Sequence, residues 1–148
     1  MKYLAYGSNL NVEQMAARCP DASIVGVGVI RDYELLFRGG LSGTYLTIRP
    51  KKGGEVPVAI WDISPMDRLA LDRYEGYPRL YYRRTLPVET DQGAIGGFVY
   101  IMREDKPLGM PSYEYLQICM EGYDDFGFDE KLLMKAMRRT REEAVAAL

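Results

Sequence analysis

Histidine is absent from the 148 residues of this sequence. Its absence excludes Ser-His-Asp and Cys-His catalysis and any metal site built on histidine, and it removes the commonest general base of enzymes. Any proton transfer must therefore use the side chain of an Asp, Glu, Lys, Tyr or Cys residue.

Cysteine is scarce, and long apolar runs are missing. Cys19 and Cys119 lie far apart and neither belongs to a CxxC motif, so we expect reduced, buried thiols. No apolar run approaches the ~20 residues of a membrane-spanning helix. The N-terminal segment also lacks the apolar core and the cleavage site of a signal peptide. These absences predict a cytoplasmic protein that does not enter a membrane.

An excess of positive charge is also lacking. The net charge is −2 and the pI about 5.3, which argues against a nucleic-acid-binding protein. The only basic cluster, residues 138–141, is followed by Glu142 and Glu143, which predicts a solvated helix face with local ion pairs. The acidic residues between Glu121 and Glu130 lack the spacing of an EF-hand loop, so we predict no metal site.

The residues that are present form many short strand-like segments. Hydrophobic residues make up 47% and charged residues 27%, which is ordinary for a soluble globular protein. Strands at hairpin spacing favour an antiparallel sheet or barrel, and Lys51–Gly54 reads as a loop or hairpin turn. The predicted strands are Lys2–Tyr6, Ser23–Arg31, Tyr33–Phe37, Tyr45–Ile48, Val56–Ile63, Tyr81–Val88 and Ile95–Met102.

The sequence predicts four helices in addition to these strands. Asn11 is a good N-cap, with Gln14 as its capping-box partner, and Ser64 followed by Pro65 is a stronger start. Gly76 is a natural residue to end the second helix. The expected helices cover residues 12–17, 65–75, about 112–122, and about 129 towards the C-terminus. With no repeat or linker, we predict a single α+β domain over residues 1–148.

The segment Tyr6-Gly7-Ser8-Asn9-Leu10 follows the first predicted strand. It can be a plain strand-to-helix turn, which its composition favours. It can also be an anion-binding loop, because Gly and Asn tolerate unusual backbone angles and let successive N–H groups converge on a carboxylate. Ser8 is a poor nucleophile candidate, since no histidine can activate it.

Glu75 occupies an unusual position for a carboxylate. It lies at the predicted C-terminus of a helix, where the partial negative charge disfavours an anion. Tyr74, Tyr77, Tyr81 and Tyr82 surround it in sequence. Both features predict a raised pKa for Glu75, which would suit it to transfer protons near neutral pH.

Taken together, these segments resemble the γ-glutamylcyclotransferase family. Tyr3–Leu10 looks like its YGSN loop, Leu71–Gly76 looks like the segment with its catalytic glutamate, and Tyr82 falls where the family has a tyrosine. Pro111–Tyr115 and Ile118–Met120 are similar to its late helix. The resemblance implies an α+β fold: a small, mostly antiparallel β-barrel with flanking α-helices.

The resemblance also implies a reaction. The α-amine of a γ-glutamyl compound attacks its own side-chain amide, which releases 5-oxoproline and a free amine without a cofactor, and Glu75 carries the proton. Such an enzyme is classed as an acyltransferase or a lyase. The residues that the resemblance assigns to substrate binding are Tyr6, Gly7, Ser8, Asn9, Leu10, Tyr82 and Tyr115.

Several alternatives stay open at this point. The leaving group can come from glutathione, a γ-glutamyl amino acid, a γ-glutamylamine or a biosynthetic intermediate. The same fold can serve as a non-catalytic γ-glutamyl or carboxylate-binding module, and the 12 tyrosines are also compatible with a protein-interaction domain. The sequence does not decide between a monomer and a homodimer.

Overall fold

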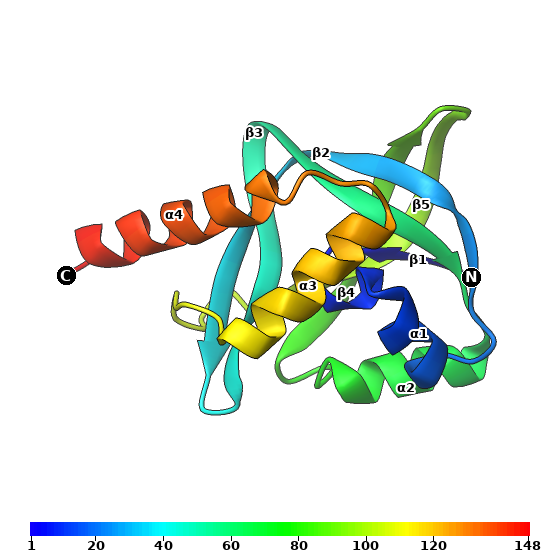
Figure 1. The fold of residues 1–148 in the computed structure, drawn as a ribbon, viewed down its shortest axis with the longest axis horizontal. Coiled ribbons are helices and arrows are strands. Elements are labelled where there is room, and N and C mark those ends of the chain that lie inside the picture. The colour runs from blue at the N-terminus through cyan, green and yellow to red at the C-terminus, as the bar shows by residue number, and fades with distance from the viewer.

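The computed structural model describes residues 1–148, and its centre is a closed five-stranded barrel (Figure 1). The strands follow the order β1-β3-β2-β4-β5 around the barrel. Neighbouring strands are antiparallel except for β1 and β5, which are parallel where Tyr3 pairs with Phe98. The predicted α+β barrel is therefore confirmed. The strands are β1 (Lys2–Ala5), β2 (Ser23–Gly40), β3 (Gly43–Asp62), β4 (Tyr81–Thr90) and β5 (Gly93–Met102).

Two long strands replace four short predicted ones. The break expected between Arg31 and Tyr33 is absent, and Lys51–Gly54 lies within β3 rather than in a hairpin turn. The physical reason is a bulge, where residues 51–54 of β3 lie opposite Asp32 alone. Asp32 has a positive φ of 64°, and its carboxylate accepts a hydrogen bond of 2.9 Å from the Gly53 amide. The turn-forming residues therefore bend a continuous ribbon.

The barrel closes where β2 meets β4. Val29 pairs with Glu89, and a Cβ atom on the adjacent Gly28 would lie 2.6 Å from the Glu89 carbonyl oxygen. A larger residue would force the two strands apart, so glycine at position 28 allows the closure.

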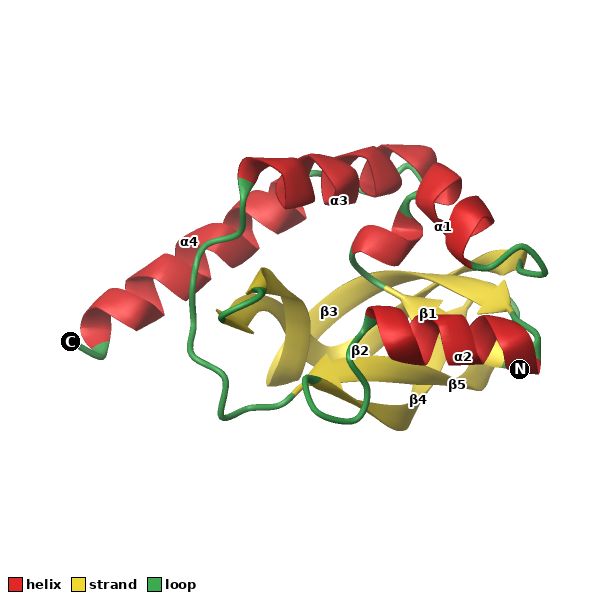
Figure 2. Ribbon diagram, turned by 90° about the horizontal axis from the view of Figure 1, so that it is seen from below, coloured by secondary structure: helices red, strands yellow, loops and turns green.

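The helices lie mainly along one side of the barrel, with α2 apart from the others (Figure 2). The predicted caps Asn11 and Ser64 are confirmed, and Ser112 caps the third helix: each accepts a hydrogen bond from the backbone amide three residues on. The Gln14 side chain, predicted as a capping-box partner, instead accepts a hydrogen bond from Arg18. The third helix continues past Gly122, its predicted end. The helices are α1 (Val12–Arg18), α2 (Pro65–Tyr74), α3 (Tyr113–Asp125) and α4 (Lys131–Ala146), and a 3₁₀ turn, η1 (Ser8–Leu10), precedes α1.

Helix α4 is attached to the β2–β3 ribbon by polar contacts. Arg49 of β3 bonds to Glu34 of β2 at 2.8 Å and to Glu143 of α4 at 2.7 Å. Arg139, from the basic cluster, contacts Glu34 at 3.1 Å. The ion pairs of this cluster thus extend to the barrel, whereas the sequence predicted local pairs along the helix.

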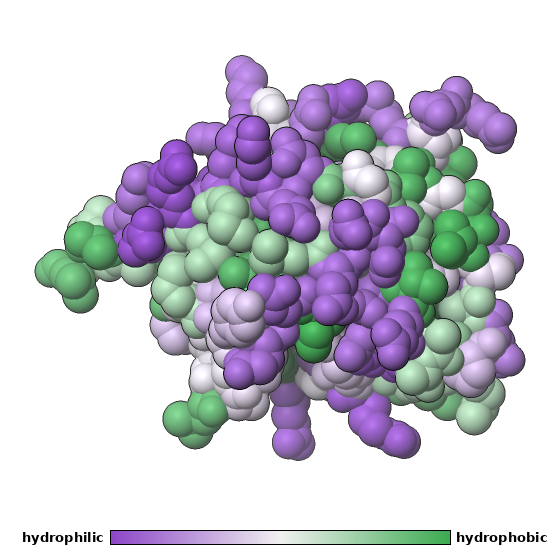
Figure 3. All heavy atoms as spheres, in the orientation of Figure 1, coloured by the Kyte–Doolittle hydropathy of each residue, from purple (hydrophilic) through white to green (hydrophobic).

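Three further features of the whole molecule are the state of its cysteines, the character of its surface and the absence of a membrane-spanning helix. Cys19 and Cys119 are both free and buried, as expected. Hydrophilic side chains cover much of the face seen in Figure 3, over α3 and the adjoining part of α4. None of the helices combines the length and the apolar character that crossing a membrane requires.

Candidate active site

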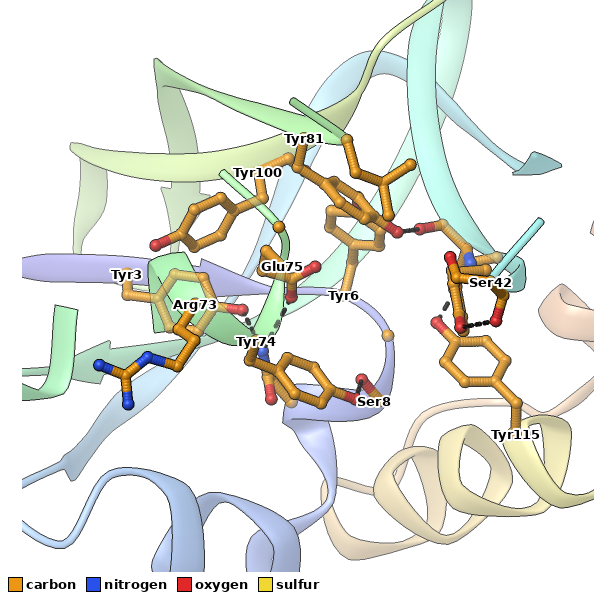
Figure 4. A pocket seen from close by; sticks show the side chains of 16 residues that line it. Tyr3, Tyr6, Ser8, Ser42, Arg73, Tyr74, Glu75, Tyr81, Tyr100 and Tyr115 are labelled. Carbon is orange, nitrogen blue, oxygen red and sulfur yellow. Dashed lines mark hydrogen bonds between the residues drawn. The ribbon is translucent and has the colours of Figure 1, made fainter. Parts of the chain in front are cut away.

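A cavity of about 420 Å³ brings together segments that are far apart in the sequence (Figure 4). The turn Gly7–Asn9 forms one part of its wall, and Glu75 forms another. Glu75 and this turn therefore lie on the wall of one cavity. Tyrosine is the most frequent residue of the wall, at positions 3, 6, 45, 74, 81, 100 and 115.

Glu75 is positioned by the end of α2. Its backbone amide still donates to the Leu71 carbonyl at 2.8 Å, so the residue completes the last helical turn. Gly76 then adopts a φ of 64°, a left-handed angle that glycine accepts without steric cost, and the chain leaves the helix. This local geometry places the Glu75 carboxyl group in the cavity (Figure 4).

The pKa of Glu75 is raised to about 8 from an ordinary value of 4.5. Burial among protein atoms is the main cause, because it disfavours the charged form. The positive charge of Arg18 and a hydrogen bond from the Asn9 side chain act in the opposite direction. The sequence predicted that the pKa of Glu75 is raised, and the structure agrees in direction. The main cause is burial.

The turn after β1 is a short 3₁₀ helix. The amides of Leu10 and Asn11 donate to the carbonyls of Gly7 and Ser8, each at 3.0 Å. The side chain of Leu10 is fully buried, and the residue does not line the cavity. This geometry argues against the predicted role of Leu10 in binding substrate, because its amide already has an acceptor. Gly7, Ser8 and Asn9 remain on the wall.

Helix α3 and strand β5 hold this turn in place. The Tyr6 hydroxyl donates to the Tyr100 carbonyl at 2.7 Å. On α3, a Cβ atom at Gly122 would lie 2.7 Å from both the Asn11 nitrogen and the Leu10 Cβ. Only a glycine lets the helix approach the turn this closely. The turn is thus fixed by contacts from distant parts of the chain.

Tyr82 does not reach the cavity. Its hydroxyl pairs with the carboxylate of Glu104 on the outside of the barrel. Neighbouring residues of a strand point to opposite faces, so Tyr81 is the inward one, and its hydroxyl donates to the Leu46 carbonyl at 2.8 Å. The prediction of Tyr82 as a wall residue is wrong by one position, and the strand alternation could have indicated the choice.

Tyr115 lies on the wall, as predicted. Its hydroxyl accepts a hydrogen bond of 3.1 Å from the Leu46 amide, and its ring packs edge-on against Tyr45 with centroids 5.2 Å apart. Ser8 also lies on the wall, and its hydroxyl is 2.9 Å from that of Tyr74.

Sequence reasoning missed two further groups at this site. Tyr100 contributes to the wall and donates a hydrogen bond of 2.6 Å to Asp72. Arg18, at the end of α1, bonds to the Asn9 side chain next to Glu75. No sequence pattern that we recognise marks either contact. The structure contains no cluster of three or more acidic, cysteine or histidine side chains suited to a metal.

Comparison with known proteins shows which family the chain belongs to. The family model described as gamma-glutamyl cyclotransferase, AIG2-like, matches residues 3–117. The chain belongs to this family. It is 32% identical over 145 residues to a gamma-glutamylcyclotransferase of Homo sapiens, a match that covers 88% of this chain and 76% of the relative. The mouse relative of the same name (Mus musculus) is 30% identical over 140 residues, with 87% and 73% covered.

A solved structure described as gamma-glutamyl cyclotransferase has a similar fold. It superimposes with a TM-score of 0.81 at 29% sequence identity, over 92% of this chain and 86% of the other. The family model's span contains the Gly7–Asn9 turn, Glu75 and Tyr115. The cavity residues therefore lie within the part of the chain that the family model matches.

Proposed function

We propose that the protein is a γ-glutamylcyclotransferase that releases 5-oxoproline from a small γ-glutamyl compound. The observation that carries the proposal is the position of Glu75, a carboxyl group with a raised pKa in the same cavity as the Gly7–Asn9 turn. The names of the relatives support the same reaction class.

The proposed reaction is intramolecular. The α-amine of the substrate attacks the carbonyl carbon of its own side-chain amide, and a new C–N bond closes a five-membered lactam. The former amide C–N bond breaks, and its nitrogen leaves as an amine. Because both reacting groups belong to one molecule, a cavity that holds the substrate bent supplies much of the rate advantage.

Glu75 is the proposed proton carrier. The substrate amine arrives as an ammonium group, which cannot attack until it loses a proton. The Glu75 carboxylate accepts this proton and then returns it to the leaving nitrogen. The attacking nitrogen loses a second proton as the lactam forms, and the released amine takes this proton up, so no net proton is consumed by the enzyme. Burial raises the pKa of Glu75 to about 8, close to that of an amine, which favours transfer in both directions.

The Gly7–Asn9 turn is the proposed anion-binding element. Its backbone N–H groups would bind the α-carboxylate of the glutamyl group or the oxyanion that forms at the attacked carbon. Tyr81 and Tyr115 would pack against the rest of the substrate. In this proposal the reaction uses no cofactor and no metal.

The proposal extends to the whole chain. Residues 1–148 would act as one cytoplasmic catalytic domain on a small molecule, without nucleic acid. A tyrosine-rich interaction surface receives little support, because only Tyr74 and Tyr113 are strongly exposed among the tyrosines and seven tyrosines line the cavity.

A substrate screen tests the proposed function. The purified protein is incubated with glutathione, γ-glutamyl amino acids and γ-glutamylamines, and the release of 5-oxoproline is measured. We expect release from at least one class, and a loss of that release in the Glu75→Gln variant. If no compound yields 5-oxoproline while one binds the cavity, the chain is a binding module and the proposal is wrong.

A further inference from the structure

The side chain of Asn9 connects Arg18 to Glu75. Its amide nitrogen donates to the Tyr3 hydroxyl at 2.8 Å and to a carboxyl oxygen of Glu75 at 3.2 Å. Its amide oxygen accepts a hydrogen bond from the Arg18 guanidinium. All the hydrogen-bonding capacity of the amide nitrogen is thus used within the cavity wall.

The chemistry of these groups fixes which way the amide points. An asparagine amide can present either its oxygen or its nitrogen to a neighbour, but a guanidinium group only donates. Arg18 therefore selects the amide oxygen. The nitrogen is left facing Glu75, where it donates a hydrogen bond to the carboxylate rather than repelling it.

We propose that Arg18 is a positioning residue of this active site, which holds the Asn9 amide in the orientation that donates to Glu75. The inference rests on the proposed role of Glu75 as proton carrier. Arg18 itself does not line the cavity, so it acts through Asn9 and through its charge.

Arg18 is itself held firmly. It lies in the last turn of α1, and its guanidinium carbon sits 3.5 Å from the centroid of the Tyr74 ring. Its other terminal nitrogen donates to the Gln14 side chain at 2.9 Å. A stacked, doubly bonded guanidinium has few alternative positions, so it can impose an orientation on its neighbour.

The tyrosine and cysteine side chains around Glu75 carry no charge near neutral pH. Burial raises the pKa values of the surrounding tyrosines and of Cys119, which keeps them protonated. On α2 itself, Asp72 is occupied by the Tyr100 hydroxyl and Arg73 is an exposed residue at the cavity. The positive charge of Arg18 therefore opposes the effect of burial on Glu75. The protonated groups are Tyr3, Tyr6, Tyr74, Tyr81, Tyr100, Tyr115 and Cys119.

Removing the charge and the donor at position 18 should have two consequences for Glu75. The carboxylate loses a favourable charge nearby, and the Asn9 amide is free to turn its oxygen towards it. Both consequences disfavour the ionised form. The Arg18→Met variant should thus ionise Glu75 at a higher pH than the wild type does.

The direct test is a titration of Glu75 by nuclear magnetic resonance in protein labelled with ¹³C at the glutamate carboxyl groups. The Glu75→Gln variant identifies the Glu75 signal by its disappearance. In Arg18→Met we expect the midpoint to rise by roughly one pH unit. Arg18→Lys keeps a charged donor and should stay near the wild-type midpoint. Arg79→Met removes an exposed positive charge close in sequence and is the matched control for net charge.

Kinetics gives a second readout. In Arg18→Met the acid limb of kcat/KM should move up with the titration, so that kcat/KM falls roughly tenfold on that limb, while the alkaline plateau changes less. A role limited to folding would instead lower the plateau and leave the midpoint in place. If Arg18→Met is not folded by circular dichroism, Arg18→Gln takes its place with the same expectation.

The outcomes separate the two proposals. An unchanged Glu75 midpoint in the neutral Arg18 variants, or an equal shift in Arg79→Met, overturns the role of Arg18 and leaves the proposed reaction intact. Absence of 5-oxoproline release from any substrate overturns the proposed reaction, while the titration still reports on Arg18 and Asn9.

Discussion

Two carboxylates in different parts of this molecule have opposite electrostatic surroundings. Glu143 on α4 receives two hydrogen bonds from Arg49, at 2.8 and 2.7 Å, and these lower its pKa. Glu75 receives one hydrogen bond from a neutral amide and is enclosed by protein, which raises its pKa to about 8. A carboxylate paired directly with arginine stays ionised and stabilises the fold. A carboxylate that is enclosed by protein and has no direct ion pair has a raised pKa, so it can exchange protons near neutral pH.

The largest expected effect comes from removing the proposed proton carrier, Glu75, from the cavity. The Glu75→Gln variant keeps the shape but cannot accept the ammonium proton. We expect turnover to fall by about 10²–10⁴-fold, or roughly 3–5 kcal/mol of barrier, with the fold intact by circular dichroism. Glu143→Gln is the matched control and should retain wild-type turnover. Cyclisation by Glu75→Gln at the wild-type rate would assign proton transfer to another group.

The next expected effect comes from removing the arginine that binds Glu143 of α4. Arg49→Met leaves Glu34, which is mostly buried, with Arg139 as its remaining partner and frees Glu143. We expect the free energy of unfolding to fall by about 1–3 kcal/mol, because a poorly satisfied carboxylate costs that much. Turnover of the folded protein should be unchanged. Denaturant titration measures the free energy of unfolding, and a 5-oxoproline assay measures turnover. A large loss of turnover would mean that the ion pairs at α4 and the Glu75 cavity are coupled.

The pH dependence of stability should have opposite signs at the two sites. The pKa of Glu75 is higher in the folded than in the unfolded protein, so the folded state binds the extra proton between pH 4.5 and 8. Its contribution therefore falls as pH rises through this range, by at most about 1.4 kcal/mol per unit. The pKa of Glu143 is lowered by folding, so its contribution is present at neutral pH and is lost on acidification.

Urea unfolding from pH 4 to 9 measures both slopes. Relative to wild type, Glu75→Gln should lose less stability between pH 5 and 8. The Glu143→Gln variant should lose less stability than the wild type when the pH falls below 5. Identical profiles for the wild type and Glu75→Gln would show that folding does not perturb the Glu75 carboxyl group.

The smallest expected effect tests the placement of two adjacent tyrosines. Tyr82→Phe removes a hydroxyl outside the cavity and should leave kcat/KM within roughly twofold, since surface substitutions cost within about 0.5 kcal/mol. Tyr81→Phe removes the hydroxyl that bonds to Leu46 in the cavity wall and should have the larger effect. A larger loss of kcat/KM in Tyr82→Phe than in Tyr81→Phe would mean that Tyr82 belongs to the active site.

The sequence predicted what depends on local chemistry. Asn11 and Ser64 cap the predicted helices because a cap needs only residues three positions apart. The joint position of Glu75 and the Gly7–Asn9 turn followed from resemblance to a family, since no spacing relates residues so far apart. The bulge opposite Asp32 was missed because glycines and lysines look alike in a turn and in a bulge. Arg18 was missed because no spacing in the sequence relates it to the Asn9 side chain or to the Tyr74 ring that it contacts.

The pH profile of kcat/KM tests the central claim most directly. Glu75 must be ionised in the free enzyme to accept a proton, so kcat/KM for a good substrate should rise about tenfold per unit along an acid limb and level off near pH 8, the raised pKa of Glu75. In Glu75→Gln this limb should disappear from the residual activity and leave only the titration of the substrate amine. An acid limb that is unchanged in Glu75→Gln would contradict the account, because it would belong to some other group.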